Sequence, residues 1–570
     1  MKKYLLIALA ALGFAACADP QDDINNPALG GEVEESFIAI NLMSADVETR
    51  AAEDSYGYEE GTDAERAINT AYFFFFDENG NPFNVTASAP GGDKNHLALT
   101  LNGTTDGTKE NVSDITNAVL VLNTYKGVYP SKIVAVLNWT PAENTTYTLS
   151  KLHELLADLG NDTDGYVMSN SVYMDGAGNV VDATPLTAAN IKTSAEKALD
   201  APVDIYVERI AAKVVLTAGG KVEDTDNIFD TQKPSTPVVV LGSASEIDVY
   251  VQIHGWELYN DYTTSNLLKT IDPAWSVTDL GLTWNDIPYY RSYWADSQDT
   301  AISDSFAWGY DYDDDDKIDS YGLSVGEATY CGENTRQAEA DTDGTILSDP
   351  RTKVILKGQL MQKNGENYES LELARWYGTE YVGRGDLKTA VANSLKYTLY
   401  YKYTAGGVEK YVSIAPEDLE CVAGTPGAEA YEVGFQLSTT GEGKTWYKYD
   451  SVNGYVSMGA KDAENDENKA KTNEYLATVE PALLYANGQT YYFVDIQHLG
   501  TAEAKYGVVR NHVYQIDIES IKGYGSPVYN GFSNIVTPPE YPTEDEASYV
   551  AARINVLSWK VVKQGVNVGN

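Results

Sequence analysis

Short apolar runs of strand length, separated by polar inserts, make up most of this sequence and favour a mainly β fold. Ala71–Phe76 carries four successive phenylalanines and is followed by Asn79-Gly80, a pair that suits the left-handed backbone of a tight hairpin. The chain contains 42 tyrosines, a residue type common on half-exposed strands. The other predicted strands are Ala118–Asn123, Lys132–Trp139, Val203–Ala218, Glu246–Gly255, Thr352–Leu360, Lys396–Tyr403, Tyr491–Gln497 and Asn511–Ile518.

Helical periodicity is confined to a few places. One predicted helix begins at Leu149 and ends before Gly160, and a second covers Asp386–Leu395. The acidic, lysine-containing stretch 460–472 is a further departure from the strand pattern. The first of these helices is predicted because five leucines fall on one face, namely Leu149, Leu152, Leu155, Leu156 and Leu159.

The N-terminus carries an export signal. Lys2 and Lys3 precede an apolar run, Tyr4–Ala16, which ends in small residues directly before Cys17. A cysteine in this place predicts a bacterial lipoprotein with Cys17 acylated, for example by palmitate, although a plain cleaved signal peptide is the alternative. The run is shorter than the ~20 residues that span a bilayer. We therefore expect an exported precursor held on a membrane surface by lipid.

The charge balance excludes some partner classes. The net charge of −44 disfavours nucleic acid and anionic lipid surfaces, because both attract lysine and arginine. Besides Cys17, only Cys331 and Cys421 remain. Outside the cytosol they could form a disulfide, but two buried thiols are an equally good interpretation.

Signals for catalysis are poor. The 5 histidines are scattered without metal-ligand spacing, and His153-Glu154 lacks the second histidine of a zinc-protease helix. Gly322–Gly326 matches a nucleophile elbow but follows a run of aspartates rather than a strand. We predict that the chain is not an enzyme.

The aspartate run is the best candidate metal site. Asp311, Asp313, Asp315 and Asp319 place carboxylates at intervals that suit Ca²⁺, which binds six to eight oxygens. The run lacks the glycine and the final glutamate of an EF-hand loop, so a solvated acidic loop is the alternative. Calcium is the one cofactor that the sequence suggests.

The two ends of the chain carry similar apolar segments. Phe37–Met43 predicts a strand with Phe37, Ile38, Ile40 and Leu42, and the polar stretch after Arg50 should be open to proteases. At the other end, the proline-rich linker Thr537–Pro542 precedes a β-branched stretch. Ala39-Ile40-Asn41-Leu42 and Arg553-Ile554-Asn555-Val556 share Ile-Asn-aliphatic, which suggests that both segments suit one groove. The alternative is an ordinary last strand folded back on its own domain. The apolar residues of the C-terminal segment include Val550, Ile554, Val556, Leu557, Trp559 and Val561.

The order of these features resembles the fimbrillins of type V pili, in particular major fimbrial subunits of the Mfa type. The likeness covers nearly the whole chain, and the ordered set rather than any one motif carries it. Besides the lipoprotein signal, Arg50 and the terminal strand, it includes Ala67–Asn79, Val134–Asn138, Val207–Val214, His254–Leu258, Lys353–Leu360, Arg375–Gly378 and Arg510–Ile518.

The resemblance implies two transthyretin-like β-sandwich domains with a few short helices. It divides the chain into a signal peptide (1–17), a leader with a removable strand (18–50), an N-terminal domain (51–220), a C-terminal domain (221–536) and a proline linker with a donor strand (537–570). The polar stretch from Gly219 to Pro237 is the best boundary candidate in the sequence itself.

The resemblance also implies a route of maturation. An Arg-specific, gingipain-like protease cuts between Arg50 and Ala51, with Arg66 as the next candidate site. The strand Phe37–Met43 leaves, and the C-terminal strand of a neighbouring copy fills the groove in a head-to-tail polymer. The implied partners are other copies of the chain, accessory, anchor or tip fimbrillins, and a surface ligand. The precursor is expected on the outer membrane and the mature form in an extracellular fimbria.

Two other functions stay open. One is an outer-membrane lipoprotein that never polymerises and binds a glycan or host ligand. Trp256, Trp308 or Trp376 could stack on sugars there, although packing in a core is the favoured interpretation of these residues. The other is an anchor or accessory subunit of the same fold. A retained lipid and an intact N-terminus favour the first, and an anchor subunit would also keep its lipid.

Overall fold

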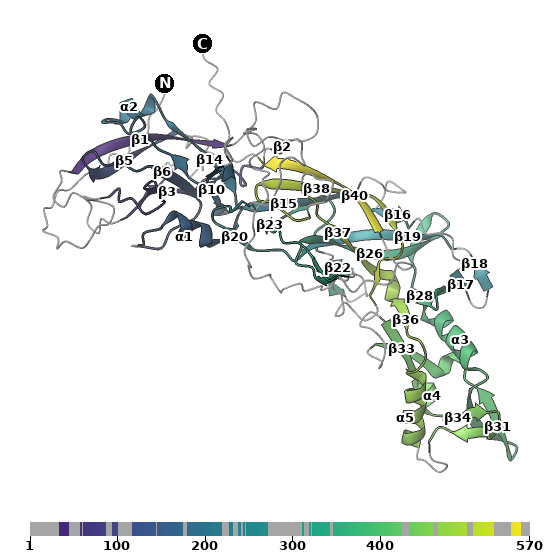
Figure 1. The fold of residues 1–570 in the computed structure, drawn as a ribbon. Coiled ribbons are helices and arrows are strands. Elements are labelled where there is room, and N and C mark those ends of the chain that lie inside the picture. Colours follow the sequence, from purple (N-terminus) through teal and green to yellow (C-terminus); the bar gives the residue numbers. More distant parts are fainter. Residues whose placement is uncertain are drawn as a thin grey trace.

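The structure, a computed structural model, consists mostly of strands with a few short helices, so the mainly β prediction is confirmed. The molecule is elongated, and it narrows from the broad part that holds β1 to an end built from α3, α5, β31 and β34 (Figure 1). The structure describes residues 33–44, 58–59, 61–86, 94–100, 117–143, 145–174, 179–218, 227–231, 238–240, 243–245, 247–271, 311–312, 318–320, 322–342, 346–423, 432–459, 465–498, 506–528 and 549–559.

The broad part is built on an eight-stranded sheet, here called the N-terminal sheet, with strand order β4-β3-β6-β10-β14-β1-β5 and β13 paired with β6. Its strands are β1 (Val33–Ser44), β3 (Thr70–Phe76), β4 (His96–Thr100), β5 (Asn117–Tyr125), β6 (Lys132–Leu137), β10 (Met168–Asn170), β13 (Thr184–Pro185) and β14 (Val203–Arg209).

Both faces of this sheet are buried, which explains the run of phenylalanines in β3. Side chains alternate between the two faces of a strand. Phe73 and Phe75 join one hydrophobic core, and Phe74 and Phe76 join another on the opposite face. The turn after β3 has Gly80 at φ +81°, as the Asn-Gly pair predicts.

The helix predicted from Leu149 to Leu159 is wrong in its second half. Helix α1 covers only Leu149–Glu154, with Thr148 as its N-cap, and Leu156–Asp158 forms strand β7. Strand β7 pairs with β20 (Thr264–Asn266), which lies far away in the sequence. This long-range pairing outweighs the leucine periodicity, a local signal that cannot include distant partners.

The long strand predicted over Val203–Ala218 is two strands. It breaks at Ile210 into β14, in the N-terminal sheet, and β15 (Ala211–Ala218), in another sheet. Arg209 donates its Nε–H to the carbonyl of Glu65 at 2.8 Å, and Asn511 accepts from the Arg209 backbone N–H at 3.2 Å. These contacts fix the chain where it passes from one sheet to the next.

The second sheet, here called the terminal-strand sheet, has the order β2-β40-β38-β15-β23. It brings together segments from both ends and the middle of the chain. Its core contains Val214, Leu216, Tyr514 and Ile516. Its other strands are β2 (Tyr58–Glu59), β23 (Ala328–Gly332), β38 (His512–Lys522) and β40 (Tyr549–Trp559).

Two larger sheets extend the molecule toward its narrow end. The six-stranded sheet contains β16 (Ile228–Asp230), β19 (Val249–Tyr259), β26 (Lys353–Asn364), β27 (Asn367–Ser370), β37 (Gln489–Asp495) and β39 (Ser526–Pro527). The seven-stranded sheet contains β17 (Val238–Val240), β18 (Ser243–Ser245), β28 (Leu373–Trp376), β29 (Thr379–Val382), β32 (Leu419–Ala423), β33 (Glu432–Leu437) and β36 (Ala482–Tyr485).

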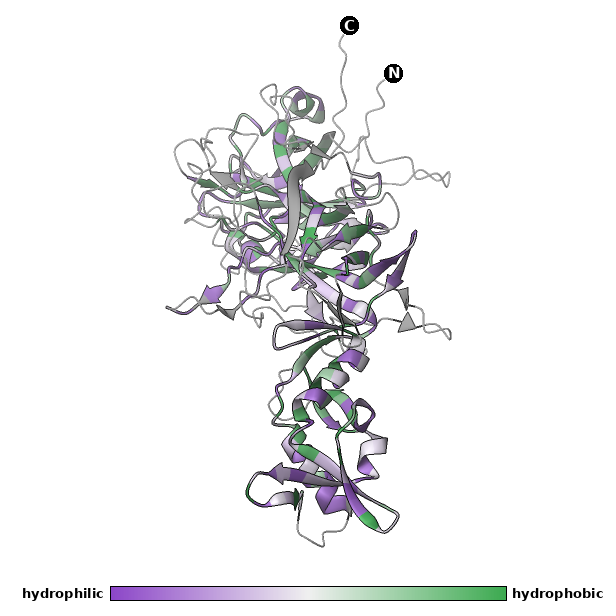
Figure 2. Ribbon diagram, turned by 90° about the vertical axis from the view of Figure 1, so that its right-hand side faces the viewer, coloured by the Kyte–Doolittle hydropathy of each residue, from purple (hydrophilic) through white to green (hydrophobic). Residues whose placement is uncertain are grey.

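The narrow end holds the second predicted helix. Helix α3 (Gly383–Leu395) confirms that prediction, and α5 (Asn465–Leu476) overlaps the acidic stretch. A four-stranded sheet, β30 (Leu399–Ala405), β31 (Val408–Ser413), β34 (Thr445–Asp450) and β35 (Gly454–Ser457), completes this end. In Figure 2 the strands and helices of this end carry hydrophobic and hydrophilic residues side by side, as expected where one face packs and the other meets solvent.

Short elements complete the described fold. They are α2 (Ala195–Leu199), α4 (Thr439–Glu442), η3 (Pro416–Asp418), η4 (Ala486–Gly488), β8 (Gly160–Asn161), β9 (Gly165–Tyr166), β11 (Tyr173–Met174), β12 (Val180–Val181), β21 (Asp311–Tyr312), β22 (Ile318–Ser320), β24 (Glu339–Ala340) and β25 (Ile346–Ser348). Within the described ranges, no helix is long and apolar enough to cross a membrane.

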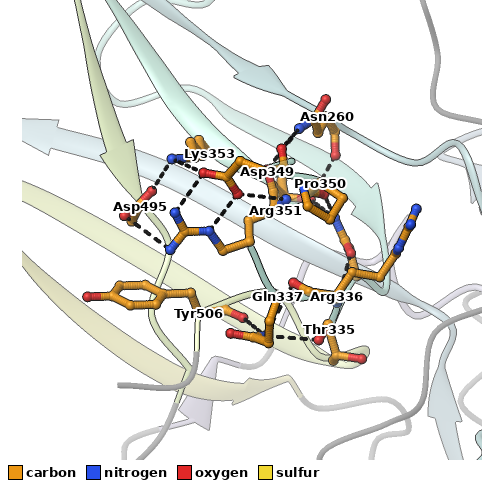
Figure 3. Close-up of polar contacts among 12 residues, drawn as sticks. Asn260, Thr335, Arg336, Gln337, Asp349, Pro350, Arg351, Lys353, Asp495 and Tyr506 are labelled. Atoms are coloured by element: carbon orange, nitrogen blue, oxygen red, sulfur yellow. Dashed lines mark hydrogen bonds and ion pairs between the residues drawn. The ribbon is translucent and has the colours of Figure 1, made fainter. Parts of the chain in front are cut away.

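A charged network ties the six-stranded sheet together at the start of β26 (Figure 3). Asp349 accepts two hydrogen bonds of 2.6 Å from Arg351 and lies 2.8 Å from the Lys353 Nζ atom. Lys353 also contacts Asp495 at 2.7 Å. Burial opposes ionisation of Asp349, but the hydrogen bonds from Arg351 and Lys353 outweigh it and lower the pKa of this carboxyl to about 2.

The two remaining cysteines are free thiols that lie on different sheets, so the structure favours the thiol interpretation over the disulfide. Cys331 is buried on β23 and Cys421 is half-buried on β32. Burial raises the pKa of the Cys331 thiol far above its ordinary value and that of Cys421 to about 11. Both groups are therefore protonated and unreactive near neutral pH.

Candidate functional site

Strand β1, which contains the predicted removable strand, is inserted between two strands of the N-terminal sheet. It runs parallel to β14, with Ile40 opposite Val203 and Ser44 opposite Val207. On its other side it runs antiparallel to β5, from Val33 opposite Tyr125 to Asn41 opposite Asn117. Removal of β1 would therefore separate β14 from β5 and leave a slot one strand wide, which we call the β1 slot.

The apolar side chains of β1 complete a hydrophobic core. Ile38, Ile40 and Leu42 are at most 2% exposed and pack with residues of β3, β5, β6 and β14. Each of these burials stabilises the fold by about 1.5–3 kcal/mol, so the three together contribute roughly 5–9 kcal/mol. That is a large part of the ~5–15 kcal/mol by which a domain is stable.

The opposite face of β1 is also covered at one position. Ala39 is 1% exposed, and the short helix α2 lies against β1 (Figure 1). The backbone of Phe37 exchanges two hydrogen bonds with Lys192, of 2.8 and 2.9 Å, just before α2. The slot therefore restricts side-chain size on both faces of the strand that fills it.

Polar contacts hold β1 near each end. Glu34 accepts hydrogen bonds from the Tyr129 hydroxyl at 3.0 Å and from the Gly127 backbone at 3.3 Å. Asn41 donates to the Asp204 carboxylate at 2.9 Å. Sequence reasoning did not identify Glu34, Tyr129 or Asp204, because their partners are distant in the chain and no motif marks them.

The predicted lipidation and processing residues, Cys17, Arg50 and Ala51, lie outside the described residues, and their roles stay predictions. The competing site, Arg66, is described. Its backbone N–H donates to Thr62 in a turn, its guanidinium lies 2.5 Å from Asp63, and its side chain is 12% exposed. A protease needs an accessible, extended segment, so this geometry disfavours cleavage at Arg66.

The residue before Arg66 anchors that turn. Glu65 is fully buried and contacts Lys213 at 3.0 Å, the Tyr330 hydroxyl at 2.5 Å and the Thr62 backbone at 2.6 Å. Burial opposes ionisation of Glu65, but these hydrogen bonds outweigh it and lower its pKa. Since Lys213 and Tyr330 belong to the terminal-strand sheet, Glu65 fastens the chain segment that follows β2 to the rest of the molecule.

The predicted donor residues from Val550 to Trp559 lie on β40, and Val561 lies outside the described residues. Strand β40 pairs antiparallel with β38, with Val556 opposite Tyr514 and Ile554 opposite Ile516. Its last residues pair with the two-residue strand β2, where Ser558 lies opposite Tyr58. In this chain the C-terminal strand is thus folded back on its own sheet.

The aromatic residues proposed to stack on sugars do not form a surface. Trp256 is fully buried and Trp376 is nearly so, while Trp308 lies outside the described residues. Exposed aromatic rings gather instead on the four-stranded sheet of the narrow end. Tyr411 stacks on Tyr455 with ring centroids 3.9 Å apart, and further ring contacts join Tyr400, Tyr447 and Tyr449 to this pair.

The aspartate run is only partly described. Asp311 pairs with Ser320 in the small ladder of β21 and β22, while Asp313 and Asp315 fall outside the described residues. Among the described residues no group of three or more histidine, cysteine, aspartate or glutamate side chains is placed to hold a metal ion. Calcium binding by Asp311, Asp313, Asp315 and Asp319 stays a prediction.

One region of the chain matches a known protein family. Residues 483–565 match the family described as major fimbrial subunit protein type IV, fimbrillin, C-terminal. These residues extend from β36 through β38 to beyond β40. In this region of the chain the match confirms the predicted fimbrillin family. No protein of curated function matches the sequence.

Solved structures of fimbrial proteins align over most of the chain at low identity. A fimbrilin (FimA) of Porphyromonas gingivalis W83 is 11% identical, covers 93% of this chain and 98% of its own, and has a TM-score of 0.34. The tip fimbrial protein Mfa3 of Porphyromonas gingivalis is 10% identical, covers 92% of this chain and 100% of its own, and has a TM-score of 0.29. A fimbrial assembly protein of Parabacteroides distasonis is 11% identical and covers 59% of this chain and 85% of its own, with a TM-score of 0.25.

Proposed function

We propose that this chain, a fimbrillin by its C-terminal region, is a structural subunit of a surface fimbria that polymerises by protease-triggered donor-strand exchange. The precursor is lipidated at Cys17 and carried to the outer membrane. An Arg-specific protease cuts between Arg50 and Ala51, β1 leaves, and β40 of a neighbouring copy enters the β1 slot. No residue has a catalytic role in this scheme.

The observation that carries the proposal is the position of β1. Its core-facing side chains are buried and it has a ladder on both sides, yet it precedes the proposed cleavage site and is joined to the rest of the chain only through that segment. A slot that loses three core side chains and two ladders is unstable when empty. A foreign strand with similar side chains would restore both, and main-chain pairing of this kind is a general mode of recognition.

The proposed cut also lies between β1 and β2. Strand β2 holds the end of β40 on the precursor's own sheet, through Tyr58 and Glu59 opposite Ser558 and Trp559. Cleavage after Arg50 gives the β2 segment a free end. The same event therefore opens the β1 slot and weakens the pairing of β2 with β40. The turn around Glu65 then keeps the new N-terminal segment attached.

Polymerisation by this scheme is head-to-tail. Each copy offers a β1 slot near one end and a β40 strand at another sheet, so the contact does not close on itself and a fibre results. Other copies and related accessory, anchor or tip fimbrillins are the expected partners, and the mature form is expected in an extracellular fimbria that supports adhesion.

The test is to treat the purified precursor with an Arg-specific protease, determine the new N-terminus and run unboiled samples on a gel. The proposal expects a start at Ala51 together with a ladder of multimers. The matched control is a precursor that lacks residues 549–570, which should be cut at Arg50 and remain monomeric. A full-length protein that is cut there and stays monomeric would contradict the proposal.

The second candidate, a lipid-anchored protein that binds a glycan or host ligand without polymerising, is favoured by the tyrosine cluster of the narrow end. Tyr449 and Tyr455 are exposed, and exposed aromatic faces often contact ligands. Replacing both residues by serine should reduce attachment of cells that display the protein while leaving the multimer ladder intact. Unchanged attachment would remove this support.

A further inference from the structure

The register in which β40 would fill the β1 slot can be derived from the contacts of β1. The shared Ile-Asn-aliphatic pattern suggests that Ile554 takes the place of Ile40, which puts Arg553 at the place of Ala39. Ala39 is 1% exposed beneath the segment that leads to α2. An arginine side chain does not fit there without displacing that segment, so the visible pattern gives the wrong register.

A shift by two residues removes this conflict and extends the match. The segment Glu-Glu-Ser-Phe-Ile-Ala-Ile-Asn-Leu of residues 34–42 then aligns with Glu-Ala-Ser-Tyr-Val-Ala-Ala-Arg-Ile of residues 546–554. Glutamate, serine and alanine recur at corresponding places, and Tyr, Val and Ile replace Phe, Ile and Leu. Residues 529–548 are outside the described part of the chain, so the comparison for Glu546 and Ser548 is one of sequence.

The recurring residues fall where the slot binds a carboxylate or accepts only a small, buried side chain. Glu546 takes the place of Glu34, whose carboxylate accepts from Tyr129 and Gly127. Ser548 takes the place of the buried Ser36, and Ala551 that of Ala39. Val550 and Ile554 supply β-branched side chains at the places of Ile38 and Leu42, which preserves the core-facing pattern.

One position gains an interaction. Arg553 takes the place of Asn41, whose amide now donates to Asp204 at 2.9 Å. A guanidinium there forms an ion pair with the same carboxylate, which a strand of the other register does not offer. Because Asp204 is exposed, the pair contributes more to register than to affinity.

We infer that β40 of a second copy fills the β1 slot with Tyr549 at the place of Phe37 and Arg553 beside Asp204, parallel to β14. This inference rests on the proposed function and specifies the strand pairing between neighbouring copies. Among the buried places of the slot, only that of Ile40, taken by Ala552, receives a clearly smaller residue. A small void at that point leaves the exchanged joint less well packed than the precursor.

The experiment uses paired cysteines in the full precursor, cut with the Arg-specific protease and then oxidised. Because Asn41 lies opposite Asp204, the inferred register brings Arg553→Cys opposite Asp204→Cys of the neighbouring copy. A disulfide-linked ladder on a boiled, non-reducing gel is expected for this pair. The matched pair Asp204→Cys with Asn555→Cys, which is opposed in the other register, should give none, and neither should the uncut precursor.

The possible outcomes distinguish a wrong register from a failure of strand exchange itself. A linked ladder with Asn555→Cys instead of Arg553→Cys overturns the register but keeps strand exchange. Absence of any multimers after cleavage, on an unboiled gel, overturns the proposed function itself. Should a cysteine variant fail to fold, charge exchange replaces it: Asp204→Arg should slow assembly up to about five-fold, and Asp204→Arg with Arg553→Asp should restore it. No restoration would also contradict the register.

Discussion

Strands β1 and β40 come from opposite ends of the chain and both lie between a parallel and an antiparallel neighbour, but they are held very differently. Strand β1 has long ladders on both sides and side chains inside a core. Strand β40 has one long ladder with β38, and its other neighbour, β2, covers only Ser558 and Trp559. Strand exchange needs one strand that can be removed by cleavage and another that can leave its own sheet. In the precursor, β1 stabilises the fold, whereas β40 is held weakly enough to exchange.

Equivalent truncations in β1 and β40 should have unequal effects on the stability of their sheets. The double variant Ile38→Ala with Ile40→Ala should destabilise the N-terminal sheet of the precursor by roughly 4–10 kcal/mol, since each buried isoleucine truncated to alanine costs about 2–5 kcal/mol. The matched double variant Ile554→Ala with Val556→Ala in β40 should have a smaller effect on the terminal-strand sheet. Hydrogen exchange of β5 and β14 amides measures the first effect, and exchange of β38 amides measures the second.

The double variant in β1 distinguishes precursor from polymer. Once β1 has been cut away and replaced, its substitutions should no longer matter, and exchange in the N-terminal sheet should equal that of the wild-type polymer. A defect that persists after processing would mean that β1 stays in its slot.

Much of the fold was predictable from the sequence, and the failures share a cause. Alternation and β-branched runs located β3, β6, β26 and β38 because those signals are local. The end of α1 and the break at Ile210 were missed because they depend on pairing with β20 and on Asn511, both far away in the sequence.

The candidate site was also predictable only in its local features. The strand character of β1 was visible, but its neighbours were not, and neither was the burial of Ala39. The burial of Ala39 excludes the register suggested by the shared Ile-Asn pattern and favours one shifted by two residues. A short sequence match therefore becomes informative only when the structure shows which positions tolerate a large side chain.

A second prediction concerns what stays behind when β1 leaves. Glu65→Ala removes a carboxylate that contacts Lys213 and should destabilise the junction by about 3–5 kcal/mol, because one member of a buried ion pair is lost. It should also release the turn and make Arg66 a cleavage site. Mass spectrometry of the Arg-specific digest tests this, with Asp63→Ala, at the exposed partner of Arg66, as the control. If Arg66 remains resistant in Glu65→Ala, the turn does not depend on that anchor.

The six-stranded sheet and the N-terminal sheet should differ in how acid changes their stability. The pKa of Asp349 is depressed to about 2 from its ordinary value of 3.8, so its stabilising contribution is present above pH 3.8 and is lost as the pH falls through 2. The variant Asp349→Asn should cost about 2 kcal/mol at pH 7 and nothing below pH 2. Unfolding followed by hydrogen exchange in β26 and β37 tests this, and amides of β5 provide the control. A cost independent of pH would show that shape rather than charge matters at this position.

The smallest effect concerns calcium. If Asp311, Asp313, Asp315 and Asp319 hold Ca²⁺, Tb³⁺ should show sensitised luminescence with the precursor, displaceable by Ca²⁺ and lost in Asp313→Asn with Asp315→Asn. Because β21 and β22 lie outside the sheets that contain β1 and β40, binding should leave cleavage at Arg50 and the multimer ladder unchanged. A ladder that requires Ca²⁺ would instead make the acidic loop part of the joint. The exchange would then be controlled by an ion as well as by the difference in how the two strands are held.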